Sequence, residues 1–187
     1  MAENARSEFI LGGQRSGKSR RAESLARQWL DGGTARHAVL IATGQAWDDE
    51  MRERIARHQR DRAERVPGMA TVEEPITLAE ALREHSTPHT LVVVDCLTLW
   101  LTNLSMPASG TPVDAKVHQL ALCHAIEAAP GPLVLVGNEI GLGVIPMGRE
   151  VRAFVDALGG LNQSVAAVCE RVTLMTAGLP LHLKEPK

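Results

Sequence analysis

The succession of apolar and polar residues predicts an α/β domain in which helices flank a mainly parallel β-sheet. Short apolar runs of strand length alternate with longer segments of helical period along the whole chain. Two of these runs, 91–94 and 133–136, contain only Leu and Val, as expected for strands buried on both faces of a parallel sheet. The length of 187 residues is typical of one domain. We therefore expect a single domain over 1–187, with the polar residues 1–7 as a flexible extension.

The first half of the chain supplies three strands and three helices. The first strand runs into a glycine-rich turn, and helical periodicity follows it. The second helix is highly charged, with acids in its first turn, where the helix dipole favours them. The third begins at Pro75, whose missing N–H does no harm in a first helical turn. The expected strands are 9–11, 38–42 and 70–72, and the expected helices are 17–30, 48–65 and 75–84.

The second half continues the alternation. Residues 106–112 combine two prolines with a serine and a glycine, so we expect a flexible stretch there. The last helix contains the pair Gly159 and Gly160, at which it can bend. The expected strands are 91–94, 133–136 and 172–175, and the expected helices are one directly after the first of these strands, 113–128 and 148–170.

Charge and composition exclude several classes of function. Residues 1–65 carry 13 Lys and Arg against 10 Asp and Glu, an excess that suits a small anionic ligand rather than a nucleic acid. Tyrosine is absent and aromatic residues are 3%, so stacking platforms for single strands are lacking. No apolar run reaches the ~18 residues of a membrane span, and the three cysteines form no CxxC pair. We therefore expect a cytoplasmic protein without nucleic-acid or membrane partners.

The sharpest local motif lies at residues 12–19, GGQRSGKS. It matches G-x-x-x-x-G-K-S, with an apolar strand before it and a helix after it. The glycines let backbone N–H groups curl round phosphate oxygens, Lys18 adds a full positive charge, and the Ser19 hydroxyl can bind Mg²⁺. The alternative is a glycine-rich turn without a ligand. Motif and context together predict a nucleotide-phosphate site, without saying which reaction follows.

Asp95 ends the run 91–94, as the Walker-B carboxylate of nucleotide-binding proteins does. At the carboxyl end of a central parallel strand it can reach Mg²⁺, directly or through water. The alternative is a helix N-cap. No convergent set of three metal ligands occurs in the sequence, so Mg²⁺ carried with the nucleotide is the only metal that we expect.

Arg54, His58 and Arg62 are spaced four apart, so they share one face of the charged helix. Such a cluster of positive charges favours bound phosphates, and a neutral imidazole is a nucleophile toward phosphorus. The alternative is a solvated helix face, because acids are interspersed along the helix.

Two further residues leave alternatives open. Cys96 suits the core better than a reactive role. Glu139 can orient a metal or accept a proton, or only make local turn bonds.

Further motifs follow the glycine-rich loop in a fixed order and cover nearly the whole chain. They are 41–45 (IATGQ), 48–51 (DDEM), Arg54-Ile55-x-x-His58-x-x-x-Arg62, Thr71-x-Glu73-Glu74-Pro75, 95–98 (DCLT), 103–104 (NL), 138–146 (NEIGLGVIP), 162–163 (NQ) and Gly178-x-Pro180. The ordered set resembles the bifunctional adenosylcobinamide kinase/adenosylcobinamide-phosphate guanylyltransferases of cobalamin biosynthesis. This resemblance implies a P-loop NTPase of RecA-like fold. The chain departs from the family at 169–172, where a more acidic stretch is expected.

The resemblance also implies the chemistry. His58 attacks the α-phosphate of GTP and releases pyrophosphate, and the GMP then passes to adenosylcobinamide phosphate. A preceding kinase reaction phosphorylates adenosylcobinamide from ATP or GTP with the help of Lys18. The resemblance further implies a homotrimer, and we expect the corrinoid between subunits or under 106–112. The implied nucleotide contacts are Gly12, Gly13, Gln14, Arg15, Ser16, Gly17, Lys18, Ser19, Thr43, Gly44, Gln45, Gln59, Arg60, Asp61, Arg62, Glu73 and Asp95, with Ser19 and Asp95 also on Mg²⁺.

Two simpler functions remain open on the residues alone. A plain small-molecule kinase would use the same loop, with His58 only binding phosphate. A non-catalytic RecA-like module would bind a nucleotide and a protein partner. Neither would form a covalent nucleotide adduct, which therefore separates both from the bifunctional transferase.

Overall fold

The computed structural model describes residues 5–46, 48–107, 111 and 113–186, and these residues contain one seven-stranded sheet. The strand order is β3-β2-β4-β5-β1-β6-β7, and every pair is parallel except β6–β7. The predicted mainly parallel α/β architecture is confirmed. The strands are β1 Ser7–Gly12, β2 His37–Ala42, β3 Ala70–Glu73, β4 Thr90–Asp95, β5 Leu133–Val136, β6 Arg171–Thr176 and β7 Leu179–Lys184.

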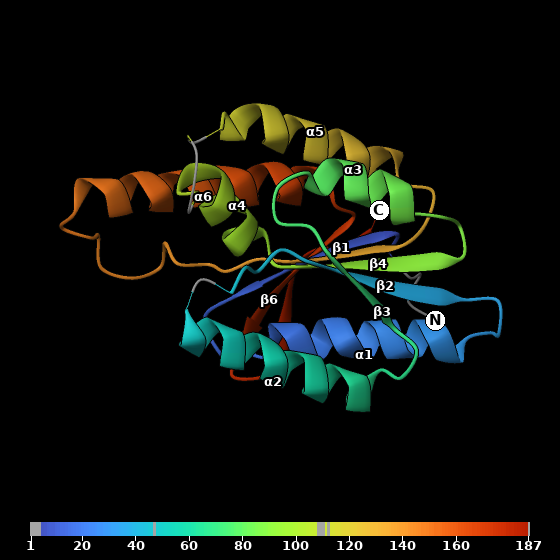
Figure 1. The fold of residues 1–187 in the computed structure, drawn as a ribbon. Helices are drawn as coiled ribbons and strands as arrows, with labels where there is room; N and C mark the ends of the chain where they lie inside the picture. The colour runs from blue at the N-terminus through green and yellow to red at the C-terminus, as the bar shows by residue number, and fades with distance from the viewer. Residues whose placement is uncertain (1–4, 47, 108–110, 112, 187) are drawn as a thin grey trace.

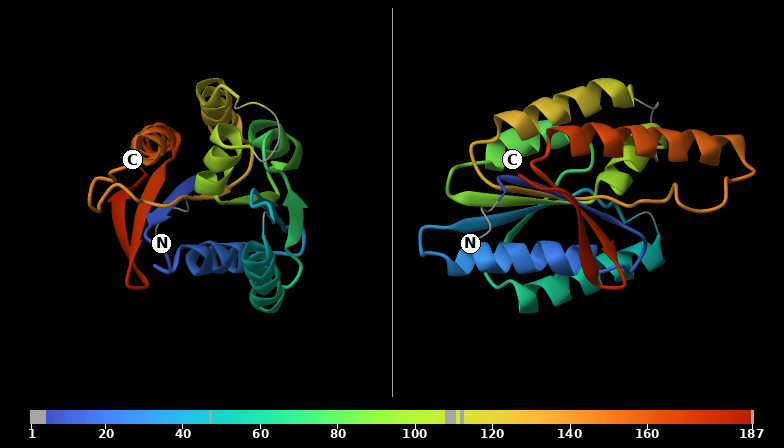
Figure 2. Two further views of the ribbon diagram at one scale, coloured as in Figure 1. Left: turned by 60° about the vertical axis from the view of Figure 1, so that its left-hand side comes forward. Right: turned by 180° about the vertical axis from the view of Figure 1, so that it is seen from behind.

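Helices cover both faces of the sheet (Figures 1 and 2), and a separate apolar core fills each interface. The larger core packs β-strand side chains against α3 to α6, and the smaller one packs the other face against α1. The described helices are α1 Lys18–Asp31, α2 Asp49–Arg65, α3 Leu78–His85, α4 Leu97–Ser105, α5 Ala115–Ala128 and α6 Arg149–Val168. Among the residues that the structure describes, no helix has the length and apolar character needed to cross a membrane.

Three details differ from the sequence prediction. Ser7 belongs to β1, so the expected extension 1–7 ends before it. Helix α3 begins three residues after Pro75, because the Glu74 carboxylate accepts the N–H groups of Ile76 and Thr77 and holds them in a turn. Strand β7 was not predicted; it contains Pro180, which an edge strand tolerates. Helix α6 is continuous through its glycine pair, as the expected helix 148–170 requires. The expected flexible stretch 106–112 falls partly outside the described residues.

The carboxyl ends of the parallel strands meet at one edge of the sheet, at the left of Figure 1. The glycine-rich loop follows β1 there, and Asp95 ends β4. Strand β5 lies between β1 and β4, so its exit at Gly137 is inserted between the loop and Asp95. Ligands of open α/β sheets bind in this position, outside the carboxyl ends of the strands.

Candidate active site

The loop 12–19 has the backbone geometry of a phosphate cradle. Gly12 and Gly17 have φ of 151° and 103°, a region that side chains rarely adopt. The Lys18 ammonium donates to the Gly13 carbonyl at 2.6 Å, and helix α1 begins at this lysine, so backbone N–H groups of its first turn face the loop. The Ser16 hydroxyl is buried and has no hydrogen-bond partner in the part of the chain that the structure describes. The backbone N–H groups and the Ser16 hydroxyl of the loop are therefore available as hydrogen-bond donors to an anion.

A Gly12→Ala variant should be destabilised, whereas Gly13→Ala should fold like the wild type. A Cβ at Gly12 would lie 2.5 Å from the Met175 carbonyl oxygen and 2.6 Å from the Ser16 hydroxyl, but one at Gly13 meets nothing within 4 Å. We expect the free energy of unfolding to fall by roughly 2–4 kcal/mol in the first variant and by less than about 0.5 kcal/mol in the second. Urea unfolding of both proteins measures the difference. Equal stability of the two variants would contradict the loop geometry.

Asp95 and Ser19 provide two oxygen donors beside the phosphate loop. The Ser19 hydroxyl donates to an Asp95 carboxylate oxygen at 3.3 Å. A hydroxyl and a carboxylate side by side are the hard oxygen ligands that Mg²⁺ prefers when it binds with phosphates. These residues therefore fit the expected metal. Cys96 is buried next to them, and burial raises the pKa of its thiol to about 11, which agrees with the predicted core role.

Burial and neighbouring charges shift the pKa of Lys18, which lies beside these residues. Burial lowers the pKa of its ammonium below the ordinary 10.5, the Arg54 guanidinium adds to this shift, and the Asp95 carboxylate opposes it. Burial likewise lowers the pKa of Arg62, and the carboxylates of Asp95 and Glu23 oppose that shift. Arg54 and Arg62 are therefore within electrostatic reach of the phosphate loop and Asp95.

Helix α2 presents its predicted cationic face to this site. Asp48 caps the helix by accepting the N–H of Met51 at 2.7 Å, and Arg65 pairs with Glu23 of α1 at 2.9 Å, so both ends are held. His58 is half-buried and lies between Arg54 and Arg62 on the same face. The structure thus brings His58 to the side of α2 that faces the phosphate loop.

Three residues implied as nucleotide contacts, Gln59, Arg60 and Glu73, are exposed. Gln59 and Arg60 are exposed, and Arg60 projects from the side of α2 opposite His58, because two residues turn a helix by about 200°. Glu73 is exposed at the end of β3, four strand positions from β1, or about 19 Å at the usual strand spacing. A contact from Glu73 therefore requires the nucleoside end of a ligand that extends along the sheet edge. Asp61 and Arg62 are half-buried on the inner side of α2.

Thr43, implied by the resemblance as a nucleotide contact, has a structural role in the described residues. Its side chain is fully buried, and its hydroxyl donates to the Cys96 carbonyl at 2.7 Å and accepts the Cys96 N–H at 2.9 Å. Its own carbonyl accepts from the Asn103 amide. The neighbouring Gly44 and Gln45 are half-buried and remain available at this turn. Thr43 therefore fixes the chain that follows Asp95 rather than offering its side chain to a ligand.

Thr43→Val should lower stability without changing the KM for GTP. The substitution leaves the Cys96 N–H and carbonyl without their partner in a buried site, at a cost of about 1–3 kcal/mol. Thr43→Ser keeps the hydroxyl and should lose less. Thermal unfolding and steady-state kinetics of both variants test this assignment. A large rise in KM for GTP with unchanged stability would instead make the Thr43 hydroxyl a nucleotide ligand.

Two features of the site were not predicted from local motifs. The β6–β7 turn supports the phosphate loop from behind, since the Gly178 N–H donates to the Ser16 carbonyl at 3.1 Å. Its only sequence signal was the Gly178-x-Pro180 match.

Glu139 joins β5 to the same loop, because its N–H donates to the Gly12 carbonyl at 3.1 Å. The Glu139 carboxylate accepts the Gly141 N–H at 2.8 Å, so it makes the local turn bond that was one of its two alternatives.

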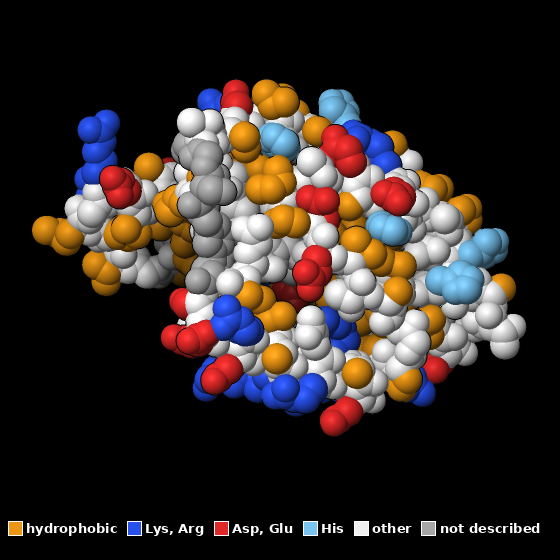
Figure 3. Space-filling view, in the orientation of Figure 1, with side chains coloured by type: hydrophobic (Ala, Val, Ile, Leu, Met, Phe, Trp, Pro, Cys, Tyr) orange, Lys and Arg blue, Asp and Glu red, His pale blue; other side chains and the backbone are white. Residues whose placement is uncertain are grey.

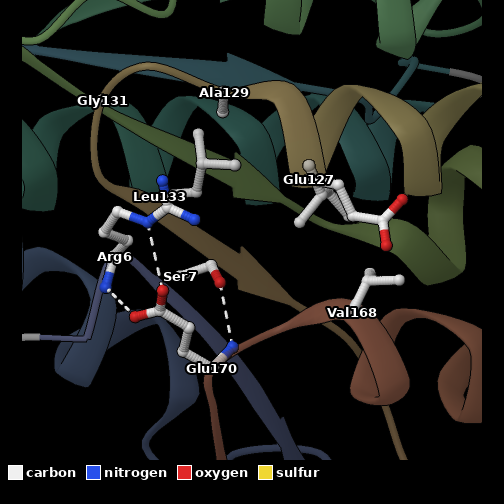
Figure 4. A pocket seen from close by; sticks show the side chains of 9 residues that line it. Arg6, Ser7, Glu127, Ala129, Gly131, Leu133, Val168 and Glu170 are labelled. Carbon is white, nitrogen blue, oxygen red and sulfur yellow. Dashed lines mark hydrogen bonds and ion pairs between the residues drawn. The ribbon is translucent and has the colours of Figure 1, made fainter. Parts of the chain in front are cut away.

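A cavity of about 180 Å³ lies at the opposite, amino end of the strands (Figure 4). Glu170 lines it and is held by the backbone N–H and side chain of Arg6, and its own N–H donates to the Ser7 hydroxyl. Partial burial works against ionisation there, but the hydrogen bonds from Arg6 lower the pKa of Glu170 below its ordinary value. The cavity is thus separate from the phosphate site.

A phosphate loop after the first strand, a carboxylate at the end of β4 and a cationic helix face above them define a P-loop nucleotide-binding enzyme of RecA-like fold. Residues 8–183 match the family described as "Cobinamide kinase / cobinamide phosphate guanyltransferase". The chain belongs to this family, and its activities are adenosylcobinamide kinase and guanylyltransferase. Membership sets aside the non-catalytic module and the plain kinase.

Curated relatives support this assignment along their whole length. The chain is 47% identical over 177 residues to the bifunctional adenosylcobalamin biosynthesis protein CobP of Pseudomonas aeruginosa, covering 95% of this chain and 96% of the relative. It is 34% identical to CobU of Escherichia coli, covering 94% and 98%. Among solved structures, flagellar accessory protein FlaH of Methanocaldococcus jannaschii aligns with a TM-score of 0.55 at 11% identity, covering 96% of this chain and 78% of FlaH. That likeness shows the fold alone.

Proposed function

We propose that one nucleotide site at the carboxyl edge of the sheet serves both reactions and that, in the guanylyl reaction, His58 carries GMP from GTP to adenosylcobinamide phosphate. In the guanylyl reaction an imidazole nitrogen attacks the α-phosphorus of GTP. A P–N bond forms, the bond between the α-phosphorus and its bridging oxygen breaks, and pyrophosphate leaves. A phosphate oxygen of adenosylcobinamide phosphate then attacks the same phosphorus, and the P–N bond breaks. This gives adenosylcobinamide-GDP and free enzyme.

In the kinase reaction the hydroxyl oxygen of adenosylcobinamide attacks the terminal phosphorus of ATP or GTP. A new O–P bond forms, the bond between that phosphorus and its bridging oxygen breaks, ADP or GDP leaves, and the hydroxyl proton is released to water. Lys18 and the backbone N–H groups of the loop neutralise charge that develops on the transferred phosphoryl group. Ser19 and Asp95 would hold Mg²⁺, which supplies further neutralisation of the phosphates when bound. Arg54 and Arg62 hold phosphate oxygens from the α2 side and so orient the nucleotide toward His58.

The observation that carries this proposal is the placement of the α2 face over the phosphate loop, with His58 half-buried between two arginines that reach Lys18 and Asp95. Intact-mass analysis after exposure to GTP and Mg²⁺ tests it. The expected result is one added GMP per chain, discharged by adenosylcobinamide phosphate. Terminal phosphate transfer with no mass increase would leave kinase activity alone at this site.

We also propose a cytoplasmic homotrimer. The three cysteines, Cys96, Cys123 and Cys169, are all free thiols, as suits a reducing compartment. The edge strand β7 exposes Leu179, Leu181 and Leu183, an apolar edge of the kind that proteins cover by association. Sedimentation equilibrium of the full chain measures the number of subunits.

A further inference from the structure

The segment between β5 and α6, residues 137–148, is an exposed apolar surface. Five of its side chains, Ile140, Leu142, Val144, Ile145 and Met147, are between 42% and 96% exposed. Hydrophobic side chains gather on the lobe at the left of Figure 3, where this segment and the start of α6 lie. Apolar surface in water costs about 25 cal/mol per Å², so a contiguous exposed patch marks a place where something binds.

This β5–α6 segment is anchored directly to the phosphate site. At its start, Glu139 donates its N–H to the Gly12 carbonyl, and Asn138 donates its N–H to the Thr98 hydroxyl at 3.0 Å. At its end, Arg152 donates to the carbonyls of Pro146 and Met147. The start of the segment is therefore held beside the phosphate loop, and its end is fixed to the first turn of α6.

The segment and helix α2 border the site from different sides. In Figures 1 and 2 the segment projects beyond the carboxyl ends of the strands, on the side of the sheet that carries α6, whereas α2 covers the other side. The α2 side is cationic and suits phosphates, as its arginines show. The segment side offers no charge among Ile140–Met147 and suits the apolar part of a second substrate.

We propose that Leu142, Val144, Ile145 and Met147 form the seat of the corrinoid substrate and hold its reacting end toward the phosphate loop. The proposal rests on the family's action on cobinamide. A corrinoid has a broad ring edge lined with methyl groups, which matches exposed branched side chains, and Met adapts to irregular surfaces. The acceptor must bring a hydroxyl to the terminal phosphate, and this apolar patch is the one bonded to the phosphate loop through Glu139.

The alternative occupant is a second copy of the chain, and one pair of variants separates the two. In the full-length protein, Val144→Ser/Ile145→Ser should raise the KM for adenosylcobinamide at least about tenfold and leave the KM for the nucleotide unchanged. GMP attachment from GTP needs no corrinoid and should proceed at the wild-type rate. The conservative variant Val144→Ile/Ile145→Val should bind the corrinoid normally. The matched control is Val117→Ser/Leu120→Ser, which alters two exposed apolar side chains on α5.

Equilibrium dialysis with adenosylcobinamide and sedimentation velocity complete the test. Weaker corrinoid binding with an unchanged sedimentation coefficient supports the seat. An unchanged KM for adenosylcobinamide would overturn the proposal, and so would dissociation of the oligomer in the Val144→Ser/Ile145→Ser variant, which would assign the segment to a subunit contact. Failure of the wild type to attach GMP would instead count against His58 and leave the corrinoid measurements unaffected.

Discussion

His58→Ala should retain no GMP after exposure to α-labelled GTP, while most of the kinase activity persists. The His58 imidazole is the nitrogen nucleophile of the α2 face, whereas the guanidinium groups of Arg54 and Arg62 are suited to holding phosphate oxygens. Loss of a covalent nucleophile lowers the rate by at least about 1,000-fold. Acid-labile label on the enzyme and release of pyrophosphate measure the first half-reaction separately from the kinase.

The helix itself supplies the control for this prediction. Arg60 lies on the opposite side of α2 from His58, so Arg60→Ala should attach GMP at the wild-type rate. Arg62→Ala keeps the nucleophile but removes a guanidinium within reach of Asp95, so it should weaken GTP binding without abolishing the adduct. Label retained at the wild-type level in His58→Ala would show that another residue is the nucleophile.

The parts of the site that the sequence predicted well are those built from consecutive residues. The loop 12–19 and the strand that ends at Asp95 each carry their geometry locally, because glycine spacing and an apolar run define the backbone without help from distant residues. The same holds for α2, whose acid-rich start and Asp48 cap agree with the predicted helix to within one residue. The position of His58 relative to the phosphate loop is not local. The spacing of Arg54, His58 and Arg62 left a solvated helix face open, and the family resemblance gave His58 its role.

The parts that the sequence predicted poorly depend on contacts between segments far apart in the chain. Strand β7 forms because β6 offers a free edge, which outweighs the presence of Pro180. The late start of α3 follows from the Glu74 carboxylate, which competes for the first N–H groups. Thr43 belongs to a motif shared with the family, but the sequence could not show that its hydroxyl is occupied by Cys96, 53 residues away.

Lys18→Ala should abolish both activities while leaving the fold intact. The Lys18 ammonium is held at the Gly13 carbonyl and faces the Asp95 carboxylate, so it is placed to balance charge on the transferred group in either reaction. We expect both rates to fall by at least about 100-fold. Lys18→Arg should not restore them, because a planar guanidinium does not fit the buried position of a compact ammonium. Lys116→Ala, an exposed lysine on α5, is the matched control.

The stability of the Lys18→Ala variant distinguishes the loss of a catalytic group from the loss of the fold. Burial disfavours the charged form of Lys18 in the native state, so its removal should leave the melting temperature unchanged or raise it. Because the native pKa of Lys18 lies below the 10.5 of an unperturbed lysine, the unfolded chain binds more protons between the two values. The free energy of unfolding of the wild type should therefore rise relative to Lys18→Ala as the pH increases through that interval. A variant that is both inactive and markedly less stable would mean that Lys18 holds the loop together rather than acting on the nucleotide.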